Sequence, residues 1–224
     1  MNIFEEGQLL LIDKPYDWTS FDVVSKLRNT MKIKKVGHAG TLDPLATGLL
    51  ILCTGTFTKK INEYMAQEKE YTGTFTLGYT TPTYDLESTP VNFIPYSDIS
   101  EEQIHQATKS FLGEISQVPP IHSAVKKDGL RAYEFARMGE HITLQPRNIN
   151  IKEFSITRIE LPSVDFRVVC STGTYIRSLA NDFGQALGTG AYLNSLCRTR
   201  IGSLLLKDAL TVDQAIGYIR QSLP

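Results

Sequence analysis

The sequence predicts an α+β protein in which helices and loops flank a mixed, largely antiparallel sheet. Its 224 residues are 42% hydrophobic and 21% charged, with 16 glycines and 10 prolines, a composition typical of a globular protein with a packed core. Strand-like and helix-like segments do not alternate regularly, as they would in a doubly wound parallel sheet. Because no repeat, low-complexity tract or clear linker divides the chain, we expect one domain spanning residues 1–224.

The N-terminal part predicts short buried strands around one helix. Apolar runs at residues 8–13 and 48–53 predict two strands, and residues 34–37 predict another. Between the strands expected at residues 8–13 and 34–37, Thr19 or Ser20 can cap a helix. The apolar residues of this helix recur at helical spacing and are Phe21, Val24, Leu27 and Met31.

The middle of the chain predicts helices on either side of a strand and a loop. Residues 58–65 predict a helix, and residues 70–79 alternate as a half-buried strand. Residues 80–95 are rich in threonine, proline and acids, which indicates an exposed loop. A capping-box pattern begins a helix over residues 100–112, and residues 130–138 predict a short one.

The C-terminal part predicts a pair of strands, a helix, a strand and a final helix. Residues 149–161 and 164–171 alternate, which predicts two paired strands joined near a proline. Residues 174–187 have apolar residues at helical spacing and end at a glycine. A last strand over residues 193–206 and an amphipathic helix from Thr211 complete the expected elements.

The cysteines and the N-terminus indicate a cytoplasmic protein. The three cysteines are widely separated and have no CxxC spacing, which argues against a disulfide framework and against a zinc site. Glu5 and Glu6 stand where a signal peptide would be positive, and the apolar runs are too short to span a bilayer. We therefore expect no membrane association.

The charges nearly cancel in number but are segregated along the chain. The 23 Lys and Arg against 24 Asp and Glu give a formal net charge of −1, which excludes a globally basic protein that coats nucleic acids. Residues 23–42 contain only cationic charged groups, residues 85–114 are mainly acidic, and residues 167–207 again favour cations. Two cationic segments on one face can bind a polyanion, but solvated helix faces would give the same pattern.

A few residues stand out as candidates for chemistry. Asp43 lies in a turn between glycines and a proline, where a loop can deliver its carboxylate, although Asp-Pro also simply initiates turns. His38 in the same turn can contact a base or phosphate, or cap local backbone. Arg177 follows a strand that passes into a helix, so its planar fork can pair with a carboxylate, a phosphate or a surface acid. Tyr71 is expected to face the core.

Motifs for metals and nucleotide cofactors are missing from the sequence. The four histidines show no HxxxH spacing and do not group with cysteines. There is no GxGxxG, GxxxxGK[ST] or GxSxG pattern. The residues alone therefore predict a protein with no cofactor and no metal, and they do not name a reaction.

The stretch 37–50, GHAGTLDPLATGLL, resembles the signature of the TruB family of tRNA pseudouridine synthases, which isomerise uridine 55 in the T loop. Further segments match that family in order along nearly the whole chain: residues 11–15 with 19–20, 69–71, 118–120 with 123–126, 173–179 and 196–199. The resemblance implies the pseudouridine synthase catalytic fold, with an active-site cleft across the sheet. It also implies that the substrate is tRNA, bound through its T stem-loop. The protein would be a monomer with no obligate protein partner and no cofactor.

The resemblance also implies roles for individual residues. Asp43 would be the nucleophile, Arg177 its ion-pair partner, and Tyr71 a stacking partner for the uracil and a candidate base. His38 would enter the T loop and hold it open once the base is flipped, and Asp85 would be an acid in the loop that contacts RNA. Other positions around the pocket and the RNA surface are Lys14, Pro15, Lys59, Tyr175 and Leu196.

Two features depart from the family's pattern. Thr81-Pro82-Thr83 stands where some members have Thr-Asp-Thr, which affects the conformation expected near Asp85. Many bacterial members continue into a C-terminal RNA-binding PUA domain, whereas this chain stops soon after the last expected helix, so that domain is either absent or cut off. Two alternative functions remain open: a tRNA-folding chaperone that acts without chemistry, and a synthase of the same fold that acts on another RNA.

Overall fold

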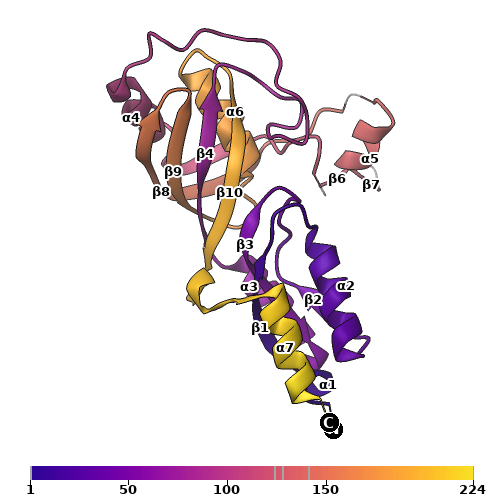
Figure 1. The fold of residues 1–224 in the computed structure, drawn as a ribbon. Helices are drawn as coiled ribbons and strands as arrows, with labels where there is room; N and C mark the ends of the chain where they lie inside the picture. The colour runs from indigo at the N-terminus through magenta and orange to yellow at the C-terminus, as the bar shows by residue number, and fades with distance from the viewer. Residues whose placement is uncertain (1, 124, 128, 141, 224) are drawn as a thin grey trace. The chain divides into compact units, whose positions relative to one another are not determined.

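The computed structural model describes residues 2–123, 125–127, 129–140 and 142–223. The chain divides into two compact units, residues 1–72 with 196–224 and residues 73–195 (Figure 1). Two strands, β4 (Lys69–Leu77) and β10 (Ala191–Ile201), each contain residues of both units. The single domain expected from the sequence remains a prediction. Of the residues considered above, Ala124 and His141 lie outside the described residues.

The first unit contains a mixed sheet with the strand order β12-β1-β3-β10. The bounds of its other strands are β1 (Leu9–Lys14), β2 (Val36–His38), β3 (Thr47–Thr54), β11 (Leu204–Leu205) and β12 (Leu210–Thr211). Strand β3 runs antiparallel to β1 and β2 and parallel to β10. Alternate residues of β3 enter two apolar clusters, Leu50 and Leu52 in one and Leu49 and Ile51 in the other, so this strand is buried on both faces.

Helices α2 (Ser20–Met31) and α7 (Val212–Ser222) supply one of these clusters. The remaining helical segments of the unit are α1 (Ile3–Glu6), η1 (Gly55–Lys60), α3 (Ile61–Ala66) and η2 (Leu206–Asp208). A capping box between Thr19 and Asp22 begins α2, as the sequence predicts. Phe21, which the sequence places on the apolar stripe of this helix, is 63% exposed. The buried stripe begins instead at Ser20 and continues through Val23, Val24, Leu27 and Met31.

The second unit contains a largely antiparallel sheet with the order β10-β4-β9-β8-β5. The bounds of its other strands are β5 (Gly113–Gln117), β6 (Lys126–Lys127), β7 (Leu130–Arg131), β8 (Arg147–Glu160) and β9 (Ser163–Cys170), and β6 pairs with β7 as a separate ribbon. Its helices are α4 (Glu101–Lys109), α5 (Ala132–Arg137) and α6 (Ile176–Ala186). Phe75 of β4 stacks on Phe166 of β9 at 4.1 Å between ring centroids, and Phe154 and Phe183 complete this aromatic core.

The structure confirms the α+β class and most elements, with several corrections. Helix α1 and strand β5 were not predicted, and the strand expected over residues 193–206 turns at Gly202 into β11. The segment 80–95 is not uniformly exposed, because Thr81, Thr83 and Asp85 are buried. Among the described residues, no helix has both the length and the apolar character needed to cross a membrane.

Candidate active site

Asp43 lies on a short loop between β2 and β3 of the first unit, and buried apolar residues fix this loop. Ala39, Leu42 and Ala46 are at most 3% exposed. The hydroxyl of Ser20, at the start of α2, accepts from the Leu42 amide at 2.9 Å and donates to its carbonyl at 3.2 Å. Asp43 itself is only half-buried, so the loop is anchored in the core while this residue remains partly exposed.

Lys14 ties this loop to the end of β1. Its side chain is fully buried, and its ammonium donates to the carbonyls of Pro15, Trp18 and Pro44, the last at 3.1 Å. Burial lowers the pKa of Lys14 from 10.5 to about 8, and the negative charge of Asp43 opposes this shift. The Lys14 ammonium and the Asp43 carboxylate therefore stabilise one another's charged forms.

Arg198 of β10 holds both ends of the Asp43 loop. It is 1% exposed, and its guanidinium donates to the carbonyl of Leu49 at 2.8 Å and to that of Gly40 at 3.0 Å. Arg198 pairs with Gly48 in the sheet, where a Cβ on the glycine would lie 2.4 Å from the Arg198 carbonyl oxygen. Arg198 was not among the predicted site residues. The available signal was an arginine within a largely buried strand, where a cation needs hydrogen-bond acceptors.

His38 is the last residue of β2 and is half-buried. Its Nδ1 atom is buried and has no hydrogen-bond partner among the described residues. Burial lowers the pKa of His38, a hydrogen bond with the Gly40 backbone partly opposes this shift, and the nearby charge of Arg198 adds to it. The net lowering favours the neutral imidazole at pH 7.

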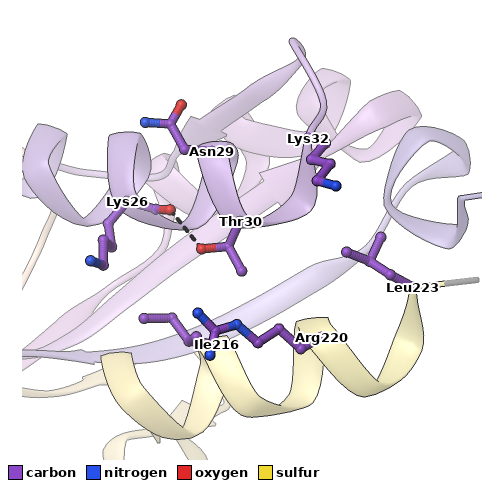
Figure 2. Close-up of a pocket in the computed structure, with 7 residues that line it drawn as sticks. All are labelled: Lys26, Asn29, Thr30, Lys32, Ile216, Arg220 and Leu223. Carbon is purple, nitrogen blue, oxygen red and sulfur yellow. Dashed lines mark hydrogen bonds between the residues drawn. The ribbon is translucent and has the colours of Figure 1, made fainter.

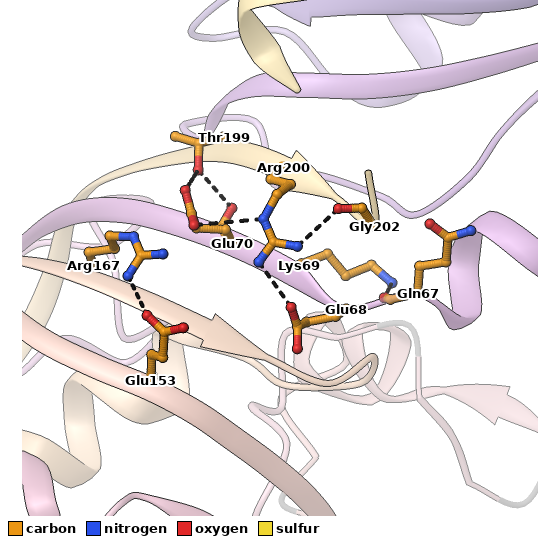
Figure 3. A network of polar contacts seen from close by, with 9 residues as sticks. All are labelled: Gln67, Glu68, Lys69, Glu70, Glu153, Arg167, Thr199, Arg200 and Gly202. Carbon is orange, nitrogen blue, oxygen red and sulfur yellow. Dashed lines mark hydrogen bonds and ion pairs between the residues drawn. The ribbon is translucent and has the colours of Figure 1, made fainter. Parts of the chain in front are cut away.

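A polar network holds the strand segment that leads to Tyr71 (Figure 3). Arg200 contacts Glu68 at 2.9 Å and Glu70 at 3.7 Å, and Thr199 donates to Glu70 at 2.7 Å. The buried Lys69 donates to the backbone carbonyl of Gln67, within the same network. Tyr71, the next residue of β4, is 9% exposed, which confirms the prediction that it faces the core.

Arg177 is the centre of a second polar cluster, at the start of α6 in the second unit. It is 5% exposed, and its Nε lies 3.6 Å from Oδ2 of Asp85. The guanidinium also donates to the carbonyls of Thr83, at 3.3 Å, and His122, at 2.9 Å. Burying a guanidinium requires such compensation, and this accounts for the burial of Thr83 and Asp85 within a segment expected to be exposed.

The predicted site residues are distributed over the two units. The first unit contains Asp43, His38, Lys14, Pro15, Lys59, Tyr71 and Leu196, and the second contains Arg177, Asp85 and Tyr175. The structure brings Asp43 together with Lys14, and Arg177 together with Asp85. The backbone of Tyr175 is held by Gln117 through two hydrogen bonds, at 2.9 and 3.1 Å. The pairing of Asp43 with Arg177 stays a prediction, since the two residues belong to different units.

The sequence matches a known family over most of its length. A family model described as TruB family pseudouridylate synthase (N terminal domain) matches residues 28–176. The chain belongs to the TruB family of pseudouridylate synthases. This match includes the Asp43 loop and the strand that carries Tyr71.

Relatives of this TruB-family chain agree with the family assignment. It is 58% identical over 214 residues to a tRNA pseudouridine synthase B of Flavobacterium johnsoniae, covering 92% of this chain and 93% of the relative. A tRNA pseudouridine synthase B of Phocaeicola vulgatus is 49% identical over 224 residues, covering 97% and 95%. A crystal structure of a Cbf5-Nop10-Gar1 complex contains a chain that is 30% identical, with a TM-score of 0.75 over 99% of this chain and 58% of that one. The expected pseudouridine synthase fold is confirmed.

Proposed function

We propose that this protein is a tRNA pseudouridine synthase, an isomerase that converts uridine 55 in the T loop to pseudouridine. The observation that carries the proposal is the 58% identity to a tRNA pseudouridine synthase B that spans more than nine-tenths of both chains. The anchored Asp43 loop supports it, because the reaction needs a carboxylate held at a fixed place. We place the reaction in the cytoplasm, where tRNA is found.

The proposed chemistry begins with extrusion of the base. A uridine in a folded loop must leave its stack before its glycosidic bond can be reached, and this unstacking costs a few kcal/mol that contacts with the protein must offset. The bond from C1′ to N1 then breaks, the uracil rotates, C1′ bonds to C5, and the C5 proton is lost while N1 gains one. The product is an isomer of the substrate, so the overall reaction consumes neither water nor electrons.

We assign Asp43 as the nucleophile in this sequence. An ionised carboxylate can attack the sugar or base, or stabilise positive charge on the sugar. The buried Lys14 of the same unit favours the charged carboxylate, and Lys14 and Arg198 together fix its loop. Tyr71 would stack on the uracil and is a candidate base, and His38 would enter the opened T loop.

Arg177 would form an ion pair with Asp43 in the working enzyme. Within the second unit, Asp85 lies 3.6 Å from the Nε of Arg177 and orients the guanidinium. The side chain of Asp85 is only 6% exposed, so its contribution to RNA binding would act mainly through Arg177 and the surrounding loop. Lys59, Tyr175 and Leu196 would border the pocket or the RNA.

The test uses the purified chain and a T stem-loop RNA, with pseudouridine mapped by carbodiimide modification and primer extension. We expect a stop at the T-loop uridine with the wild type and none with Asp43→Asn. Asp98→Asn, which removes an exposed carboxylate, is the matched control and should retain the stop. Turnover by Asp43→Asn would contradict the nucleophile assignment. Absence of the stop with the wild-type chain alone would contradict the proposal that no protein partner is needed.

A further inference from the structure

A groove between α2 and α7 of the first unit gathers cationic side chains (Figure 2). We call it the α2–α7 groove. It has a volume of about 550 Å³ and is lined by Lys26, Lys32 and Arg220 over an apolar floor of Ile216 and Leu223. All three cations are exposed, and no salt bridge engages them within the described part of the chain.

Two further hollows adjoin this groove and share residues with it. On one side, Lys32 also lines a hollow of about 420 Å³ with Lys34 and Lys35, where Glu5 is the acidic neighbour. On the other side, Lys26 lines a second hollow of about 420 Å³ with Asp17 and Trp18. The three hollows therefore follow α2 from one end to the other.

The second of these hollows leads back to the Asp43 loop. The backbone amide of Asp17 donates to the carbonyl of Pro44 at 3.0 Å. The Lys14 ammonium donates both to this carbonyl and to the carbonyl of Trp18. Helix α2 has 12 residues and is thus about 18 Å long. The α2–α7 groove lies about 10–20 Å along this helix from the residues that hold the proposed nucleophile. The acids Asp17 and Asp22 line the hollow that lies nearest the Asp43 loop, so the cationic part of the three hollows begins at Lys26.

Helix electrostatics alone does not account for this arrangement. Cations in the last turn of a helix are stabilised by its dipole, which explains Arg28 in α2 and Arg220 in α7. It does not explain Lys26 in the middle of α2, nor Lys34 and Lys35 beyond its end. A surface of exposed, unpaired cations is favourable when a polyanion covers it, because binding releases condensed counterions.

We propose that the α2–α7 groove, extended by Lys34 and Lys35, binds the phosphodiester backbone of the substrate tRNA outside the T loop. This inference rests on the proposed function, which makes tRNA the polyanion that must lie against the first unit. The contacts would be to phosphates and would not read the base sequence. They would supply affinity and orientation at a distance from the reacting uridine.

The test is filter binding of full-length tRNA over a range of salt concentrations, with the triple variant Lys26→Ala/Lys32→Ala/Arg220→Ala. We expect the Kd at about 0.1 M salt to rise about tenfold or more, and the slope of log K against log salt to fall by about 3, one for each lost phosphate contact. Because all three residues are exposed, the variant should remain folded, which circular dichroism checks.

The matched control is Lys109→Ala/Arg147→Ala/Arg158→Ala, which removes the same charge from exposed positions of the second unit. The inference is overturned if the groove variant keeps the wild-type slope, or if the control lowers the slope equally. It is also overturned if the groove variant loses binding to phosphatidylserine vesicles but not to tRNA. Pseudouridine formation by the wild type in the same preparation reports the proposed function separately.

Discussion

The guanidinium of Arg198 donates a hydrogen bond to the backbone oxygen of Gly40 at 3.0 Å, three residues before Asp43. The same group donates to the oxygen of Leu49 at 2.8 Å, six residues after Asp43. One buried side chain of β10 thus fixes both ends of the loop that carries the proposed nucleophile. The position of the carboxylate depends on this contact as well as on the loop's own sequence.

Replacing Arg198 by lysine should therefore impair catalysis more than binding. Lysine keeps the charge but not the planar fork, so at least one buried carbonyl loses its donor. We expect the free energy of unfolding to fall by about 2 kcal/mol and kcat to fall at least about tenfold, with a smaller change in KM for the RNA. Steady-state kinetics and urea unfolding measure these effects. Arg158→Lys, at an exposed ion pair with Glu160, is the control, and an unchanged kcat for Arg198→Lys would contradict the positioning role.

Gly48 is a second point at which the loop depends on close packing. Its φ is +100°, and a Cβ there would lie 2.4 Å from the backbone oxygen of Arg198. Gly113 has a similar φ of +83° but open space around its missing Cβ. We expect Gly113→Ala to lower the free energy of unfolding by about 1 kcal/mol through backbone strain alone. Gly48→Ala should lower it by clearly more, since β10 must also move away from β3.

Urea unfolding of the two alanine variants tests this comparison. Gly48→Ala should in addition lose pseudouridine formation, because the shift displaces the Asp43 loop. Equal losses of unfolding free energy in the two variants would contradict this expectation, because they would show that β10 accommodates the new Cβ without destabilising the fold.

Local sequence signals predicted the elements that local physics determines. The capping boxes at Ser100 and Thr211 begin α4 and α7 where expected, and the β8–β9 hairpin lies where alternation placed it. Apolar spacing did not identify the buried face of α2 correctly at Phe21. Residues three apart differ by about 300° round a helix, so a run at this spacing moves off one face, and packing against the sheet decides which face is buried. The segment 80–95 failed for a different reason, since its buried polar residues satisfy Arg177, a partner far away in sequence.

The candidate site shows the same division. The motif around Asp43 was visible in the sequence, whereas Arg198, 155 positions later, joins it only through the pairing of β10 with β3. Lys14 was predicted as a pocket residue, but its complete burial and its three carbonyl partners could not be read from a Lys-Pro pair. Long-range polar contacts of buried cations leave little local pattern, because any strand residue can provide a carbonyl.

The Arg177–Asp85 pair should be sensitive to loss of its acid. Asp85→Asn removes the negative charge that lies 3.6 Å from the Nε of Arg177, a side chain that is 5% exposed, and we expect the free energy of unfolding to fall by about 3 kcal/mol. Glu160→Gln is the matched control, because it breaks a pair with Arg158 in which both side chains are more than 60% exposed. That change should be below about 1 kcal/mol. Similar effects of the two substitutions in urea unfolding would contradict the structural role of Asp85.

Lys14 should make the activity sensitive to alkaline pH. Its pKa of about 8 in the folded protein compares with an ordinary value of 10.5 for lysine. As pH rises through about 8, the ammonium loses its proton and the Asp43 carboxylate loses a stabilising cation. We expect kcat to fall severalfold between about pH 7 and pH 9, with an apparent pKa near 8.

The same titration should act on stability in the opposite direction. Between about pH 8 and 10.5 the unfolded chain binds more protons at this position than the folded one, so the contribution of Lys14 to the free energy of unfolding rises with pH. Below about pH 8 both states are protonated, and the unfavourable burial of the charge is constant. The wild type should therefore gain stability between about pH 7.5 and 9 relative to Lys14→Met, which has no proton to lose.

Three variants separate the charge from the side chain. Lys14→Arg, if it folds, remains charged at pH 9, so its kcat should stay flat where that of the wild type falls. Lys14→Met should have a low kcat at both pH values, because three carbonyls lose their donor. Asp213→Asn, at an exposed position of α7, should follow the wild-type profile. A flat wild-type profile, or an equal alkaline fall in Lys14→Arg, would show that another group governs the pH dependence.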